Sequence, residues 1–265
     1  MRFNRKNGLI LLFMGICITL ACKKDKHVIK KGVETIPPPI EVAEKANLPI
    51  QLISGKSKMV FSYTANLSLS KIDYSNGDSV VLKYTSTGKP SDFFRYKGGK
   101  LIFDSEFTLD KNGFVVEADQ YTIKDGNYIL NGYYSLIYNT TGRLLTLSYY
   151  TTDNQLVNEQ QKIYTAAGNL SNDNSAVPDL MLNYKYDDKN GIFKNANYAW
   201  LYVLEKENIL FLSALNNVQQ YNYPLMPDNN QSFTYVYNAD QYPVTINSTL
   251  KGVSSSMTVT YKQLN

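Results

Sequence analysis

The side chains able to perform acid–base or nucleophilic chemistry in this sequence are almost all carboxylates. The one histidine is His27, and the two cysteines are Cys17 and Cys22, so all three lie near the N-terminus. Imidazole-based catalytic triads and histidine metal sites need groups that the rest of the chain does not have. The sequence therefore indicates a protein that is not an enzyme of these classes.

Two pairs of carboxylates have the spacing that places side chains on one face of a strand. Asp104 and Glu106 are two residues apart, and so are Glu117 and Asp119. Paired carboxylates are the machinery of glycoside hydrolases. Nothing in the sequence forces their pKa values apart, as the separate roles of acid and base require. Solvated strand positions are the favoured interpretation, and a carboxylate-dependent glycoside hydrolase is the lesser alternative.

Two acidic stretches contain oxygen ligands beside a glycine, as calcium loops do. They are Asp187-Asp188-Lys189-Asn190-Gly191 and Asp110-Lys111-Asn112-Gly113. Neither has the spacing of the calcium-loop consensus, and no distal glutamate follows. Ordinary turn chemistry explains both stretches, so no metal and no cofactor are expected.

Aromatic residues offer one candidate platform for a ligand. Trp200 stands between Tyr198 and Tyr202, and Trp and Tyr are enriched at binding hot spots. The alternative is that these rings pack into the fold, because tryptophan is highly buried on average. The hypothesis is a ligand-binding site for a glycan or a peptide.

The N-terminus has the pattern of an export leader. Arg2, Arg5 and Lys6 precede an apolar run from Leu9 to Leu20, which is followed by Ala21 and Cys22. This end resembles the bacterial lipoprotein signal, in which the cysteine is acylated and becomes the new N-terminus. We expect residues 1–21 to be a signal peptide and Cys22 to carry a membrane anchor; a soluble exported protein with a chance cysteine is the alternative.

Residues 22–47 are expected to be a lipidated, flexible tether. The triplet Pro37-Pro38-Pro39 favours an extended chain, and lysines gather between Lys23 and Lys31. The formal net charge of +4 comes from the leader and this tether, so that the remainder is near neutral. A nucleic-acid partner is not expected, because the domain has no basic excess.

A motif of the form Tyr-x-x-x-Gly sets the period of residues 48–265, which we expect to be one domain. An aromatic residue ends a strand, small polar residues reverse the chain, and glycine adopts a left-handed conformation. The chain also has 22 tyrosines and 11 phenylalanines, which suit pleated, half-buried surfaces. The copies begin at Tyr84, Leu109, Tyr138 and Tyr164, with a degenerate copy at Tyr237.

The repeat predicts an all-β antiparallel meander, forming one strongly curled sheet or an open half-barrel. A two-sheet sandwich is the alternative. The rhythm stops after Leu170, where residues 172–178 are interpreted as a polar loop. Apolar residues spaced for one helical face predict a short helical or irregular insert near residues 197–216, a plug or lid that Glu207-Asn208 could split. We expect any function to lie between Asn172 and Pro227.

The stretch from Tyr184 to Asn195, together with the leader and the hairpins, resembles a Bacteroidota lipoprotein family of unknown function with a porin-like fold. The resemblance covers about residues 48–265 and implies a single curled sheet with no catalytic residues. The hairpins also resemble the tyrosine–aspartate repeats of large bacterial surface and toxin-shell proteins.

These observations together predict a non-catalytic, lipid-anchored protein of the cell envelope, most naturally at the outer membrane. Its role would be that of a module that binds a glycan or peptide on a tyrosine-rich sheet. A structural or assembly component of an outer-membrane complex is the alternative.

Overall fold

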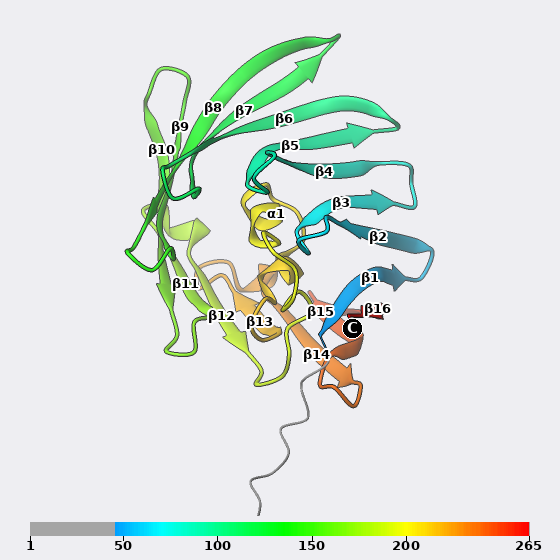
Figure 1. Cartoon of the computed structure of the whole chain (residues 1–265). Coiled ribbons are helices and arrows are strands. Elements are labelled where there is room, and N and C mark those ends of the chain that lie inside the picture. The colour runs from blue at the N-terminus through cyan, green and yellow to red at the C-terminus, as the bar shows by residue number, and fades with distance from the viewer. Residues whose placement is uncertain (1–45, 265) are drawn as a thin grey trace, which may run out of the picture. The chain divides into compact units, whose positions relative to one another are not determined.

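The computed structural model describes residues 46–264, which form a closed antiparallel β-barrel around a short helical insert (Figure 1). The predicted leader, Cys22 and most of the tether lie outside the described residues. Within residues 46–264, no helix is both long and apolar enough to cross a membrane.

Every strand pairs with its neighbours in the sequence, and the first strand pairs with the last. The first eight strands are β1 (Asn47–Ser54), β2 (Ser57–Tyr63), β3 (Leu69–Tyr74), β4 (Ser79–Tyr84), β5 (Pro90–Lys97), β6 (Lys100–Leu109), β7 (Val115–Lys124) and β8 (Asn127–Tyr138). The remaining strands are β9 (Leu144–Tyr150), β10 (Leu156–Tyr164), β11 (Leu170–Ser175), β12 (Leu182–Tyr186), β13 (Val218–Asn222), β14 (Gln231–Tyr237), β15 (Pro243–Leu250) and β16 (Val253–Gln263).

The closed barrel corrects the expectation of an open half-barrel, a single curled sheet or a sandwich. All-β antiparallel structure is confirmed, but Leu52 of β1 stands opposite Val259 of β16, so the sheet has no free edge. An open sheet would leave a row of unpaired backbone groups at each edge. Closure pairs both rows, and the sequence motif carried no information about this long-range contact.

The turn motif is confirmed as a hairpin device. In the copy that begins at Tyr138, the Asn139 N–H donates to the Arg143 carbonyl at 2.9 Å, and the Gly142 N–H donates to the Asn139 carbonyl at 3.0 Å. The strand register shifts between Ile137 and Tyr138, as in a three-residue hairpin loop that ends in a bulge. The same pair of backbone bonds and the same shift occur in all the copies.

All copies of the motif lie at one rim of the barrel. They connect even-numbered strands to odd-numbered ones, and the chain enters β1 at Asn47 and leaves β16 at Gln263 on that same rim. The connection from β12 to β13 starts from this rim as well. It holds the insert, with α1 (Trp200–Leu204) and the 3₁₀ turn η2 (Ile209–Leu212).

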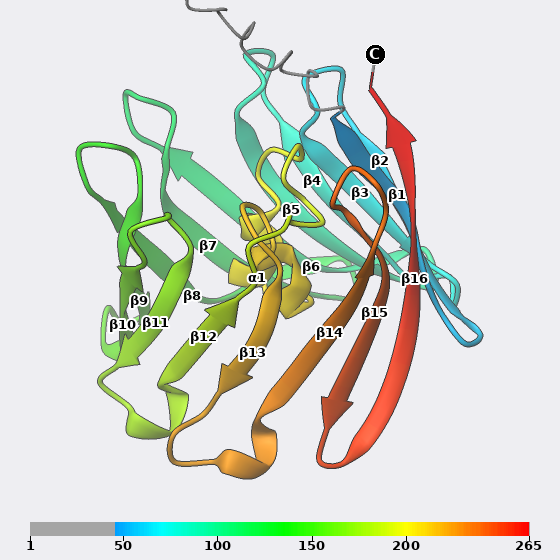
Figure 2. The same cartoon turned by 90° about the horizontal axis from the view of Figure 1, so that it is seen from below.

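The insert packs inside the barrel, where α1 is surrounded by strands in both views (Figures 1 and 2). Leu201 and Tyr202 of α1 are fully buried, and Phe211 of η2 contacts the ring of Phe61 from β2. The split expected at Glu207 is confirmed, because α1 ends at Leu204 and η2 begins at Ile209. The expected insert is therefore present as an internal plug.

Two carboxylates hold this plug against the barrel wall. Glu207 accepts hydrogen bonds from the Tyr74 hydroxyl at 2.7 Å and from Arg95 Nε at 2.9 Å. The fully buried Glu205 accepts a hydrogen bond from Gln120 Nε2 at 3.2 Å, and burial raises the pKa of Glu205. Strands β3, β5 and β7 are thus linked to the plug by polar contacts.

The outer wall of the barrel carries charge. Ile72 of β3 is fully buried inside, so its neighbours Lys71 and Asp73 point outward, where they form an exposed ion pair. Lys83 likewise flanks the buried Leu82 on β4. The apolar faces of these strands are turned inward.

Candidate functional site

The inner face of β10 and β11 is polar, unlike the apolar inner face around the plug. Gln160 stands opposite Leu147 of β9, which stands opposite the buried Leu136 of β8, so the register places Gln160 inside the barrel. Ser175 stands opposite Gln160 on the other side. The residues of this surface, named here the polar inner wall, are Asn158, Gln160, Lys162, Asp173 and Ser175.

An ion pair forms the centre of the polar inner wall. Lys162 and Asp173 are directly opposite each other on β10 and β11, with Lys162 Nζ 2.8 Å from Asp173 Oδ1. Lys162 Nζ also donates to Gln160 Oε1 at 3.0 Å, and the Tyr184 hydroxyl donates to Asp173 Oδ2 at 2.7 Å. The two charges offset each other, so the wall is electrically neutral.

Tyrosines near the rim divide into two groups by the partners of their hydroxyls. Tyr63 donates to the Pro49 carbonyl at 2.6 Å, and Tyr261 donates to the Pro243 carbonyl at 2.9 Å. Tyr84 makes the same kind of bond to the Leu69 carbonyl at 2.7 Å. These tyrosines tie one strand to the preceding one and are structural.

Tyr138 of β8 and Tyr186 of β12 form the other group. Both hydroxyls are buried and neither has a hydrogen-bond partner within residues 46–264. A buried polar group without a partner costs about 1–3 kcal/mol, and such groups call for a specific explanation, such as a bound water or ligand. These two hydroxyls belong to strands on either side of the polar inner wall.

The phenols of this region stay protonated at neutral pH. Burial, with the Asp173 carboxylate nearby, raises the pKa of Tyr164 to about 12, although the Arg143 guanidinium opposes the shift. Burial raises the pKa of Tyr138 and of Tyr186 even more strongly. Neutral phenols can both donate and accept hydrogen bonds. The region therefore suits a neutral polar ligand, such as a sugar hydroxyl or a peptide amide.

The three aromatic residues predicted as a ligand platform lie at the plug. Tyr202 is fully buried, and its hydroxyl donates to the Leu69 carbonyl at 3.2 Å. Trp200 and Tyr198 are half-buried, and the Tyr198 ring lies 5.7 Å from that of Tyr84. A platform built from this trio is therefore limited to Tyr198 and Trp200 unless the plug moves.

The four carboxylates of the glycoside hydrolase alternative are not scattered. Glu106 and Asp119 stand directly opposite each other on the outer wall, with Asp104 and Glu117 beside them. Asp104 is buried, and burial together with Asp92 and Glu106 raises its pKa to about 6. They lie on the outer wall, and neither of the two hollows described next is lined by any of them.

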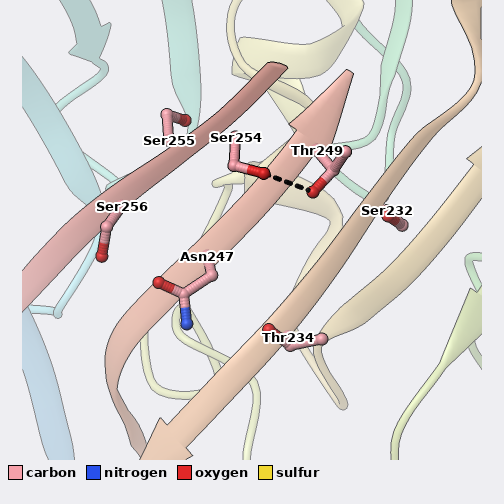
Figure 3. Close-up of a pocket in the computed structure, with 7 residues that line it drawn as sticks. All are labelled: Ser232, Thr234, Asn247, Thr249, Ser254, Ser255 and Ser256. Carbon is pink, nitrogen blue, oxygen red and sulfur yellow. Dashed lines mark hydrogen bonds between the residues drawn. The ribbon is translucent and has the colours of Figure 1, made fainter. Parts of the chain in front are cut away.

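A hollow of about 330 Å³ lies on the outer wall of β14–β16 (Figure 3). Its lining has hydroxyl and amide groups only, and Thr249 Oγ1 lies 3.2 Å from Ser254 Oγ. No aromatic or charged side chain lines it, so it offers a ligand neither a ring for stacking nor a charge for an ion pair. The lining residues are Ser232, Thr234, Asn247, Thr249, Ser254, Ser255 and Ser256. A second hollow, of about 200 Å³, lies beside Met59, Tyr74 and Met257.

The polar inner wall was missed in the sequence because its second strand was interpreted as a loop. Residues 172–175 belong to β11, which corrects that interpretation. The detectable signal was in β10, where Asn158, Gln160 and Lys162 occupy every second position of a polar run that Val157 and Ile163 flank. From Asn158 to Lys162 both faces of β10 are polar, because Glu159 and Gln161 lie on the outer face. In the described part of the chain, no group of His, Cys, Asp and Glu is arranged to hold a metal ion.

Comparison with protein-family models finds no match, and comparison with curated proteins finds none either. Among solved structures, a porin-like protein from Bacteroides uniformis ATCC 8492 matches with a TM-score of 0.50 at 11% identity, covering 83% of this chain and 96% of the other. The expected porin-like fold is therefore confirmed. At this identity the likeness concerns the fold alone.

Two weaker likenesses decide nothing about the chain. A porin-like protein from Bacteroides vulgatus ATCC 8482 gives a TM-score of 0.42 at 13% identity, covering 83% of this chain and all of the other. The TcdB2-TccC3-Cdc42 structure gives 0.31 at 14% identity, and the match spans only 9% of that chain against 73% of this one. Membership of the lipoprotein family and the kinship with tyrosine–aspartate repeats remain predictions.

Proposed function

We propose that this chain is a non-catalytic, lipid-anchored envelope protein whose barrel binds a neutral polar ligand, a glycan or a peptide, at the polar inner wall. The observation that supports it is the pair of buried, unpartnered hydroxyls of Tyr138 and Tyr186, on strands that flank the polar inner wall with its Lys162–Asp173 ion pair. Such groups reduce stability unless something else satisfies them.

The charged side chains on the outer wall favour a barrel that lies in water and is attached to the membrane by a lipid. Lys71, Asp73 and Lys83 point outward, and a basic side chain facing lipid costs about 2–4 kcal/mol at the bilayer midplane. The apolar outer band of a transmembrane barrel would be interrupted at β3 and β4, although exposed apolar side chains such as Ile137 and Ile163 occur on β8 and β10. Attachment would then fall to an acyl group on Cys22.

A matched set of tyrosine variants tests the binding site. Tyr138→Phe and Tyr186→Phe remove hydroxyls that have no partner, so each variant should keep or raise the melting temperature of the full chain. Tyr261→Phe removes a hydroxyl bonded to Pro243 and should lower the melting temperature.

Affinity should follow the opposite pattern. Calorimetric titration of a panel of neutral oligosaccharides and peptides should find a ligand whose affinity falls about tenfold in Tyr138→Phe or Tyr186→Phe, as the loss of one hydrogen bond predicts. Tyr261→Phe should leave the affinity unchanged. Absence of binding across the panel, or equal losses in all three variants, would contradict the proposal.

A further inference from the structure

The outer wall of β5, β6 and β7 gathers five carboxylates. Glu106 of β6 stands directly opposite Asp92 of β5 on one side and Asp119 of β7 on the other. Asp104 is two residues from Glu106 along β6, and Glu117 is two residues from Asp119 along β7. Because alternate residues share a face of a strand, all five point away from the barrel interior. We name this set the acidic outer patch.

The charges of the acidic outer patch are only partly compensated, by Lys83 of β4, which stands opposite Asp92. Across the described chain, the side-chain ion pairs and hydrogen bonds involve none of its five carboxylates. Like charges directly opposite each other on neighbouring strands are destabilising. A near-neutral domain thus concentrates unpaired negative charge on three adjacent strands, at a cost to its own stability.

Asp104 is the member of the patch whose carboxylate is enclosed by neighbouring side chains. It is 8% exposed, and its Oδ1 has no hydrogen-bond partner in residues 46–264. Phe94 stands opposite it on β5, and Tyr121 stands opposite it on β7. A carboxylate between two aromatic side chains is the chemistry that recognises an ammonium or guanidinium group, through charge-assisted hydrogen bonds and cation–π contact.

The chain already places one of its own cations over the Phe94 ring. Lys83 of β4 stands opposite Asp92, and its Nζ lies 4.4 Å from the centroid of the Phe94 ring. A cation is therefore accommodated on this ring. A metal ion is the weaker candidate, since no cluster among the described residues is arranged to hold one.

We propose that the acidic outer patch docks a basic segment of a partner protein, with an arginine or lysine side chain held by Asp104 and the Phe94 ring. Charge complementarity selects this partner. The proposal concerns the outer wall and is independent of ligand binding at the polar inner wall. The incoming cation takes the place of Lys83 over Phe94.

The test uses the full chain and a dye-labelled nona-arginine peptide, with a glycine–serine peptide of equal length as the reference. Fluorescence anisotropy should show binding of nona-arginine alone, weaker in high salt because exposed charges are screened. Asp104→Asn and the double variant Glu106→Gln/Asp119→Asn should each weaken binding about tenfold or more, since each removes charge-assisted contacts. The exposed pair Asp153→Asn/Asp228→Asn has the same change in charge as the double variant and should stay within about twofold.

Lys83→Met should change the affinity for the peptide in the opposite direction to the carboxylate variants. It removes the resident cation and should tighten peptide binding, which no loss of folding could imitate. The proposal is overturned if nona-arginine fails to bind at low salt, if the Asp153/Asp228 control loses as much affinity as the patch variants, or if Lys83→Met weakens binding. Displacement of the peptide by millimolar calcium, with calcium bound in its place, would also overturn it in favour of an ion site.

Discussion

Lys162 and Asp173 form an ion pair across β10 and β11 inside the barrel, with Nζ and Oδ1 2.8 Å apart and side-chain exposures of 10% and 6%. Elsewhere the described inner face is filled largely by apolar side chains and the plug. A pair of buried charges is weak evidence for stability, because desolvation opposes their attraction. The pair is better understood as the neutral centre of a polar surface than as part of the core.

Removal of one partner of this pair should be strongly destabilising. Lys162→Met leaves Asp173 buried with the Tyr184 hydroxyl as its remaining partner, and breaking a buried pair costs about 3–5 kcal/mol. Lys162→Met/Asp173→Asn should recover much of that loss, because no uncompensated charge is left. Urea denaturation at pH 7 measures both free energies of unfolding. A double variant as unstable as the single one would show that the charge is not the cause.

Asp104→Asn should stabilise the free protein in a pH-dependent manner. The pKa of Asp104 is raised to about 6 in the folded state from an ordinary value of 3.8. Between these two pH values the folded state binds more protons than the unfolded state, so stability falls as pH rises through the window. The melting temperature of Asp104→Asn should exceed that of the original protein at pH 7.5, and the difference should shrink towards pH 4. A gain that is independent of pH would rule out this explanation.

Gly142→Ala tests the turn motif against a matched glycine. Gly142 has φ of +78°, and an added Cβ would lie 2.5 Å from Cζ of Phe114. Gly126 has φ of +79°, but its Cβ would meet nothing within 4 Å. Gly126→Ala should cost about 1–2 kcal/mol for the left-handed backbone alone, and Gly142→Ala should cost more because of the added clash. Equal losses in thermal denaturation would mean that the Phe114 ring moves aside freely.

Substitutions in the aromatic trio at the plug should differ in their cost to stability, because Tyr202 belongs to the core and Trp200 lies nearer the surface. Tyr202 is fully buried, with its ring 5.3 Å from that of Phe93 and stacked on that of Phe211, so Tyr202→Ala should cost about 3–5 kcal/mol. Trp200→Ala should cost less, because Trp200 is only half-buried. Chemical denaturation measures both. If Trp200→Ala alone abolishes binding of a panel ligand, the platform hypothesis of the sequence is supported over the inner wall.

Cys22 remains a predicted lipidation site outside the described residues. Metabolic labelling with a fatty acid should mark the original protein and not Cys22→Ser, and cell fractionation should move the variant from the membrane to the soluble fraction. A variant that stays in the membrane fraction would contradict anchoring by this lipid.

Local features were predictable from the sequence, because they depend on a few neighbouring residues. The turn at residues 138–144 forms as expected, since glycine is strained least in the left-handed conformation that Gly142 adopts. The insert was predicted from spacing as well, and its α1 and η2 fall within residues 197–216. The polar strand β11 was not predicted, because Asn172 to Ser175 have the composition of a loop and become a strand through pairing with β10 and β12.

The sequence by itself determined the antiparallel strands, the shared turn geometry and the interrupting insert, all of which arise from contacts close along the chain. Only the tertiary structure decided that the sheet closes, since the pairing of Leu52 with Val259 joins the two ends of the domain. Closure also decided which residues share the interior. It brought Lys162 and Asp173 together on a polar inner wall, and it turned Asp104 and Glu106 to the outside. Alternation shows that a strand has two faces, but only the closed barrel determines which face is enclosed.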